Sequence, residues 1–337
     1  MSLDERLAAT LAAHAGADPD PAPIVERARH RGRRLKRRRR GLIGLGAAAV
    51  CAVVAAVFLV PQSGPVRRAD AVLLPAAPGR PGAADRPDLV GTDPWTLHFT
   101  ADDLVAGAGH VEWKAGGGFE SVEYWGPGGH GRLLLAQDTD TLDPIKQALS
   151  STASIEYRSN PTEVRVAGRP GTARFEPNGG GPDLWVVRWE PLDGLWARLE
   201  VYANGQDAAI AVAERFRYDG ARRCAVPFRL TELPAGSRTL VCSVQLGATF
   251  IEGTLVVNDD TRRWVSVRAQ LTEDEGPAEV RRRGERADVL EKRVEPFAVE
   301  AHLSGLGNTP RSYTEEEGRA ILNGVRPNGD PDEISTW

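Results

Sequence analysis

The strongest constraint on this chain is Gly41–Val60, a stretch of twenty consecutive residues without a charge. A helix rises about 1.5 Å per residue, so this stretch would be about 30 Å long as a helix. That length matches the hydrocarbon core of a bilayer. The sequence therefore predicts one transmembrane helix over 41–60.

A cluster of positive charge precedes this stretch. Ten of the fourteen residues Arg27–Arg40 are Arg or Lys. Such clusters can bind nucleic acid, but beside a membrane span they mark the cytoplasmic side and contact anionic lipids. The adjacency favours the second interpretation, with the lipid bilayer and no nucleic acid as a partner. The basic residues expected to flank the membrane are Arg33, Arg34, Lys36, Arg37, Arg38, Arg39 and Arg40.

The sequence argues against three alternatives to a retained membrane anchor. A cleaved signal peptide would fit the A-x-A pattern at Ala69–Ala71. However, the forty residues before the apolar stretch and the twenty residues of the stretch itself are both too long for a signal peptide. A lipoprotein signal ending at Cys51 would need a small residue before it, and Val50 is there. A twin-arginine export signal requires an Arg-Arg pair, which any run of arginines contains, so the match is not specific. We therefore expect a single-pass plasma-membrane protein, with residues 1–40 cytoplasmic and 61–337 extracytoplasmic.

Charge divides the chain in the same way. Residues 1–40 hold eleven Arg and Lys against five Asp and Glu, whereas residues 41–337 hold thirty-one against forty-one. A basic arm and an acidic body are typical of parts in different environments. Residues 61–94 contain seven prolines and four glycines, which predicts an extended linker. The folded domain is expected over 95–337.

Alternating apolar residues indicate strands in this domain. Leu184–Glu190 and Leu195–Ala203 are joined by an Asp193-Gly194 turn, which predicts a hairpin with Leu195, Ala197, Leu199 and Val201 toward the core. A second hairpin is expected around Asp259–Thr261. The predicted fold class is α+β: a cytoplasmic arm, one transmembrane helix, and an extracytoplasmic, mainly antiparallel sheet with a few helices on one face.

Two helices are predicted in this domain. One covers about Gln206–Phe216, where apolar residues recur at helical spacing. The other begins at Thr314, which forms a capping box with Glu317, and ends before Gly324.

Two cysteines lie in the folded domain. If residues 224–230 paired with 240–246, Cys224 would face Cys242 within bridging reach. The sequence thus predicts a disulfide outside the cytoplasm, and two unpaired thiols are the alternative.

Sequence motifs for catalysis are missing. The domain's histidines, His98, His110, His130 and His302, have no G-x-S-x-G serine near them, and no phosphate-binding or dinucleotide glycine pattern occurs. Asn258–Asp260 lacks the spaced carboxylates and glycine of a calcium loop, so a solvated turn is expected there. We expect neither enzymatic activity nor a cofactor or metal.

Aromatic residues of the first hairpin form a candidate binding face. They are Trp185 and Trp189 on one strand, with Trp196 and Tyr202 across from them. An exposed aromatic surface can bind sugars, lipids or peptides, and core packing is the alternative.

The amino-terminal part resembles the membrane-anchored, anti-sigma-like proteins of high-GC Gram-positive bacteria. The resemblance rests on SLDERLAATLAAHA (Ser2–Ala15), the DPDP break (Asp18–Pro21), the arginine run and the single span. Val187–Tyr202 followed by Ala208–Phe216 is similar to sheet-then-helix units in their outer domains. The zinc-binding His-x-x-x-Cys-x-x-Cys helix of many anti-sigma factors is missing from this arm.

The resemblance implies a sensor or regulator whose arm contacts a cytoplasmic regulator such as a sigma factor. The alternative is a surface-anchored protein that binds a cell-wall, lipid or peptide ligand from the envelope.

Overall fold

The computed structural model describes residues 73–126, 129–142, 160–176, 182–247, 250–261, 263–272, 277–283, 288–303, 313–330 and 333–337. They belong to one compact unit, Pro65–Trp337. The predicted arm, its basic residues Arg33 to Arg40 and the stretch 41–60 lie outside the described residues. No helix within the described ranges combines the length and apolar character needed to cross a membrane.

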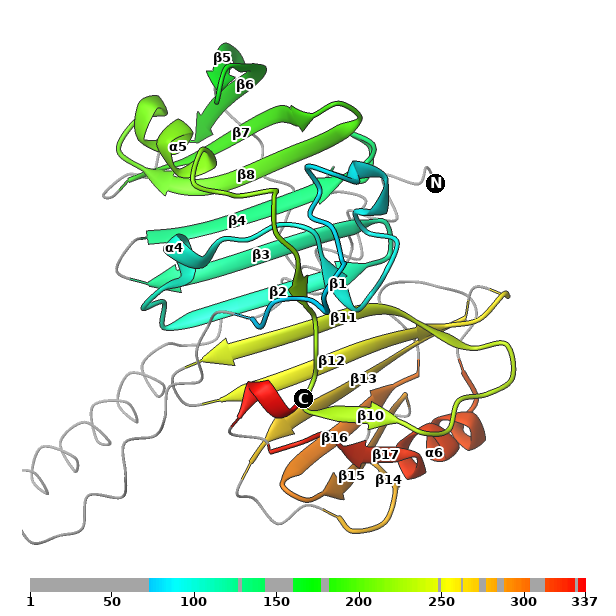
Figure 1. The fold of residues 1–337 in the computed structure, drawn as a ribbon. Coiled ribbons are helices and arrows are strands. Elements are labelled where there is room, and N and C mark those ends of the chain that lie inside the picture. Colours follow the sequence, from blue (N-terminus) through cyan, green and yellow to red (C-terminus); the bar gives the residue numbers. More distant parts are fainter. Residues whose placement is uncertain are drawn as a thin grey trace, which may run out of the picture. The chain divides into compact units, whose positions relative to one another are not determined.

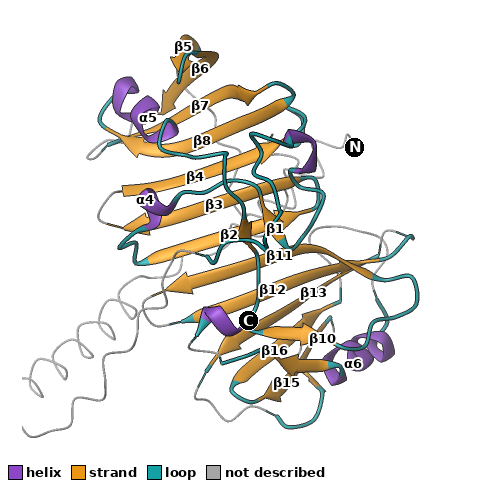
Figure 2. Cartoon of the chain, in the orientation of Figure 1, coloured by secondary structure: helices purple, strands orange, loops and turns teal. Residues whose placement is uncertain are grey.

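One antiparallel sheet dominates the described residues (Figures 1 and 2). Its thirteen strands follow the order β14-β15-β16-β13-β12-β11-β2-β3-β4-β8-β7-β6-β5. The strands are β2 (His110–Gly116), β3 (Phe119–Gly126), β4 (Gly129–Ala136), β5 (Thr162–Val166), β6 (Arg169–Glu176), β7 (Asp183–Leu192), β8 (Leu195–Ala203), β11 (Arg238–Gly247), β12 (Ile251–Asn258), β13 (Trp264–Leu271), β14 (Arg281–Arg282), β15 (Val289–Val294) and β16 (Phe297–His302).

The remaining elements are short. Two strand pairs lie outside the large sheet, β1 (Thr96–Leu97) with β9 (Arg222–Arg223), and β10 (Phe228–Leu230) with β17 (Val325–Pro327). The described α-helices are α4 (Asp102–Val105), α5 (Gln206–Ala213) and α6 (Glu315–Asn323), with 3-10 turns η1 (Pro87–Leu89) and η2 (Ile334–Thr336).

The predicted α+β fold class, which included a transmembrane helix, is therefore wrong. The described chain is mainly one large sheet, and its longest helix, α6, has nine residues. Alternation along the chain reveals each strand locally, but it does not say how many strands join into one sheet. The helical part of the described chain is small.

Both predicted hairpins are present. Strands β7 and β8 are joined at Asp193-Gly194, where Gly194 has a φ of +77°. Strands β12 and β13 pair with Leu255 opposite Val267. Both connections are short, so the sequence around each turn sufficed to predict them.

The predicted capping box of α6 is confirmed as well. The Glu317 N–H donates to Thr314 Oγ1 at 3.2 Å, and Glu317 Oε2 accepts from the Thr314 N–H at 2.8 Å. The helix ends at Asn323, directly before Gly324, as expected.

One face of the sheet carries the hydrophobic core. Trp113 and Tyr124, for example, are at most 1 % exposed. Residues 73–105, helix α5, the chain from 214 to 230 and helix α6 all contribute buried side chains to this core. Figure 1 shows the chain leaving α5 and crossing the strands toward β10. We call residues 214–230 the crossing segment.

The described part of the predicted linker belongs to this core. Leu73, Ala83 and Val90 are each at most 2 % exposed. This part of the chain packs against the core with hardly any regular secondary structure. The proline- and glycine-rich composition therefore did not indicate that its side chains are buried.

Candidate functional site

A pocket of about 360 Å³ opens between the crossing segment and the sheet. The exposed side chains Trp95 and Leu233 mark its rim, at 42 % and 37 % exposure. Its volume lies at the lower end of the range for small-molecule sites, roughly 300–1,000 Å³. The lining residues are mostly apolar: Trp95, Arg223, Cys224, Ala225, Val226, Phe228, Arg229, Leu230, Leu233, Thr239, Leu255, Asn328 and Trp337.

Backbone pairing holds the crossing segment along this pocket. The Cys224 N–H donates to the Trp95 carbonyl at 2.9 Å, beside the β1–β9 pair. Further along, β10 pairs with β17, placing Leu230 opposite Val325. The pocket wall is therefore built from parts of the chain that are far apart in sequence.

A glycine permits the close approach of the crossing segment to the sheet. A Cβ at Gly253 of β12 would lie 2.7 Å from Val226 Cβ and 2.8 Å from Pro227 Cδ. Both distances are shorter than ordinary carbon contacts. Only glycine fits here while the crossing segment keeps its place.

The predicted disulfide between Cys224 and Cys242 is present, with Cα atoms 6.3 Å apart. The hairpin from which it was predicted is wrong. Strand β10 pairs with β17, whereas β11 pairs with β12 and β2. The disulfide thus ties the crossing segment to a central strand of the sheet and borders the pocket.

The four residues of the predicted aromatic face do not share a face. Trp185 and Trp189 are buried opposite Val201 and Ala197, on the core side. Trp196 and Tyr202 lie on the other side, where Tyr202 is 38 % exposed.

A shift in register explains this separation. Leu192 pairs with Leu195, but an irregularity after Trp189 makes Trp189 face Ala197, where an unbroken ladder would give Arg198. A slip of one residue moves every side chain of a strand to the opposite face. The bulge therefore turns both tryptophans into the core.

A row of aromatic rings, which the sequence analysis missed, crosses the outer face of the sheet. His110 stacks on Trp125 at 4.7 Å between ring centroids, and His130 stacks on Tyr202 at 5.6 Å. Trp125 and His130 meet edge to face at 5.1 Å, and Phe250 lies 5.6 Å from His110. Each ring of the row therefore lies against at least one neighbouring ring. Trp125 and His130 lie on either side of one glycine-rich turn, and this spacing could have indicated that the two rings meet across a hairpin.

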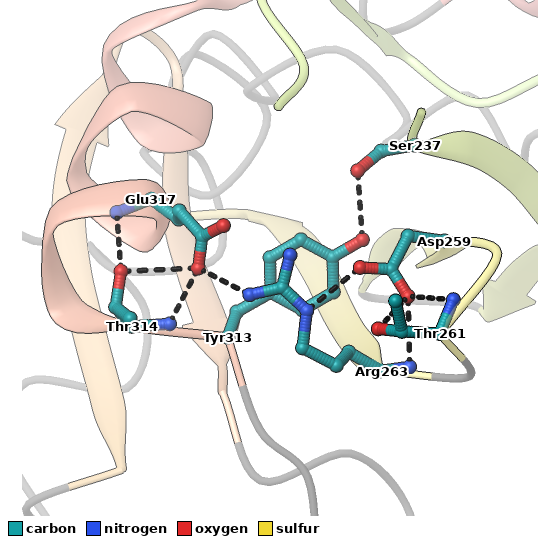
Figure 3. A network of polar contacts seen from close by, with 7 residues as sticks. All are labelled: Ser237, Asp259, Thr261, Arg263, Tyr313, Thr314 and Glu317. Carbon is teal, nitrogen blue, oxygen red and sulfur yellow. Dashed lines mark hydrogen bonds and ion pairs between the residues drawn. The ribbon is translucent and has the colours of Figure 1, made fainter. Parts of the chain in front are cut away.

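A polar network joins the β12–β13 turn to α6 (Figure 3). Arg263 contacts Asp259 at 2.7 Å and Glu317 at 2.9 Å, and its guanidinium lies 4.7 Å from the centroid of the Tyr313 ring. The Tyr313 hydroxyl is 2.8 Å from Ser237 Oγ. Every residue drawn has a partner within the network. The network therefore serves to connect the β12–β13 turn to α6.

The network perturbs the pKa of Asp259. Burial acts to raise this pKa, but hydrogen bonds from Thr261 and from the backbone and guanidinium of Arg263 outweigh it and hold the pKa at about 2. The carboxylate is satisfied by its own turn, in line with the expected turn at this position. Within the described ranges, no three His, Cys, Asp or Glu residues are grouped as a metal site would require.

Comparisons with known proteins give little further guidance. No family model matches the chain, and no curated protein matches it. One solved structure, described as MucB in complex with MucA(peri), is 15 % identical and covers 65 % of this chain and 93 % of that chain. Its TM-score is 0.23, too low to indicate a common fold.

Proposed function

We propose that this chain is an extracytoplasmic binding protein whose pocket takes a small ligand with an apolar part. The observation that carries the proposal is the pocket between Trp95, Leu230 and Leu233, which joins exposed apolar side chains to a buried core. A mostly apolar pocket with a few polar groups is the usual form of a small-molecule site.

The disulfide supports the proposed location. Disulfides persist in oxidising compartments and are rare in the cytoplasm of mesophiles. The Cys224–Cys242 bond fits a domain outside the cytoplasm, on the plasma-membrane protein with a cytoplasmic amino terminus that the sequence predicts.

Photochemical labelling tests the pocket. The full chain, in phosphatidylcholine discs that suit the apolar run Gly41–Val60, is irradiated with decanol bearing a diazirine, and labelled peptides are identified by mass spectrometry. We expect labels on the peptides that contain Trp95 and Leu230–Leu233. Trp95→Ala should reduce this labelling several-fold.

Trp125→Ala is the matched control, because Trp125 is 47 % exposed but lies outside the pocket. It should leave the labelling unchanged. Labels spread evenly over the surface, or a Trp95→Ala variant that labels like the wild type, would refute the pocket.

A regulatory role is the second candidate. It is supported by the basic arm, with Leu3, Leu7 and Leu11 at helical spacing, joined to an acidic body. Crosslinking in cells from a probe at Leu7 or Leu11 tests it. Capture of a sigma factor or another soluble regulator supports signalling, whereas capture of lipids and membrane neighbours alone makes the arm an anchor.

A further inference from the structure

One charged side chain in the pocket has no partner. Arg223 of β9 donates its backbone N–H to the Leu74 carbonyl at 2.9 Å, which fixes its backbone. Arg223 is one of the residues that line the pocket, and its Nη2 is buried without a hydrogen bond. Among the described residues, the Arg223 side chain makes neither a hydrogen bond nor an ion pair.

The neighbouring arginine behaves differently. Arg222 forms an ion pair with Asp102, although the two arginines are adjacent in β9. Two arginines line the pocket, Arg223 and Arg229. Arg229 is exposed, and it too has no carboxylate partner in the described part of the chain. No Asp or Glu lines the pocket. The side chains that line the pocket therefore include two positive charges and no negative one, within an acidic domain.

An unpaired guanidinium N–H is costly in such a place. Burying a donor without an acceptor loses its hydrogen bonds to water, and the loss is larger for a charged group. A bound anion would satisfy it, because the planar guanidinium matches the oxygens of a carboxylate or phosphate. The apolar lining would at the same time hold a hydrocarbon chain.

We propose that the ligand of this pocket is an amphipathic anion. Its carboxylate or phosphate binds Arg223, with Arg229 at the entrance, and its apolar chain lies against Trp95, Leu230 and Leu233. This inference rests on the proposed function, because it assigns a chemical class to the ligand of the same pocket.

The test adds a charge to the labelling experiment. Diazirine-bearing decanoate and decyl phosphate are compared with the uncharged decanol in the same discs. We expect an anion to reach half-maximal labelling of the pocket peptides at a concentration about tenfold lower than decanol does, the effect of one charge-assisted hydrogen bond. The better of the two anions identifies the head group, carboxylate or phosphate.

Variants of Arg223 show whether the guanidinium is responsible. Arg223→Gln should remove the preference for the anion and leave decanol labelling intact, while Arg223→Lys should keep part of the preference. Arg169→Gln is the control, since Arg169 is an exposed arginine paired with Asp193 outside the pocket. It should label like the wild type.

Folding is checked by the thermal midpoint without ligand. Arg223→Gln should be at least as stable as the wild type, because the substitution replaces a charged buried donor that lacks an acceptor by a neutral amide. If Arg223→Gln fails to fold, the comparison of Arg223→Lys with the wild type still shows whether the Arg223 guanidinium causes the preference for the anion.

The outcomes separate the two proposals. Pocket labelling by decanol, with no preference for either anion or with a preference that Arg223→Gln and Arg223→Lys fully retain, overturns the anion inference and leaves the binding function standing. Absence of pocket labelling by every probe overturns both.

Discussion

His98 and Glu120 are joined by a buried side-chain hydrogen bond, with His98 Nδ1 2.6 Å from Glu120 Oε1 and exposed fractions of 2 % and 0 %. The same carboxylate accepts the His98 backbone N–H at 2.6 Å and the Gly91 N–H at 3.0 Å. Glu120 belongs to β3, whereas His98 and Gly91 belong to the segment that packs over the sheet. One side chain therefore fastens residues 91–98 to the core face.

Replacing Glu120 should loosen this attachment. Glu120→Ala leaves two backbone donors and an imidazole without their acceptor, and we expect the free energy of unfolding to fall by about 3 kcal/mol. Urea denaturation followed by tryptophan fluorescence measures the change. Glu163→Ala, at an exposed glutamate on edge strand β5, should change it by less than about 0.5 kcal/mol. Equal effects of the two variants would contradict the fastening role.

The close approach at Gly253 can be tested separately. Gly253→Ala inserts a methyl group against Val226 and Pro227, so we expect a loss of about 1–3 kcal/mol in unfolding free energy. Because the crossing segment must move, labelling of the pocket by decanol should also change. Gly109→Ala is the control, since its nearest contact would be the Trp125 carbonyl at an unstrained 3.8 Å. A fully tolerated Gly253→Ala would argue against tight packing here.

The disulfide should contribute both to stability and to the pocket. Cysteines separated by 18 residues close a loop whose crosslink is worth about 3 kcal/mol. A double variant, Cys224→Ser with Cys242→Ser, should melt at a lower temperature and label less with decanol. Dithiothreitol should lower the melting temperature of the wild type and leave that of the double variant unchanged. A wild type insensitive to reductant under unfolding conditions would contradict this contribution.

Local signals in the sequence predicted local structure well. The β7–β8 hairpin follows from Asp193-Gly194, and the start of α6 follows from Thr314 and Glu317, because each depends on a few consecutive residues. The partner of β10 could not be predicted in this way. It is β17, and Phe228 pairs with Pro327 across a long stretch of sequence, which no alternation pattern encodes.

The site shows the same limit. The pairing of Cys224 with Cys242 was predicted correctly from a wrong hairpin, since a disulfide requires only that two backbones come within reach. The side of the sheet on which Trp185 and Trp189 lie depends on a one-residue irregularity in register, which the sequence pattern does not indicate. The pocket was missed because Trp95 and Arg223 meet only through the β1–β9 pair, which unites distant segments.

The last prediction concerns acid. The folded-state pKa of Asp259 is about 2, below the ordinary 3.8, so the ionised carboxylate stabilises the fold. This stabilisation is fully present above about pH 4 and is lost as the pH falls through about 2. Asp259→Asn lacks it at every pH, so the variant should be less stable than the wild type at neutral pH, and the difference should shrink between pH 4 and pH 2. Urea denaturation across this range measures the difference, with Asp193→Asn at an exposed turn as the control. A difference that does not depend on pH would show that the carboxylate of Asp259 acts only through its shape.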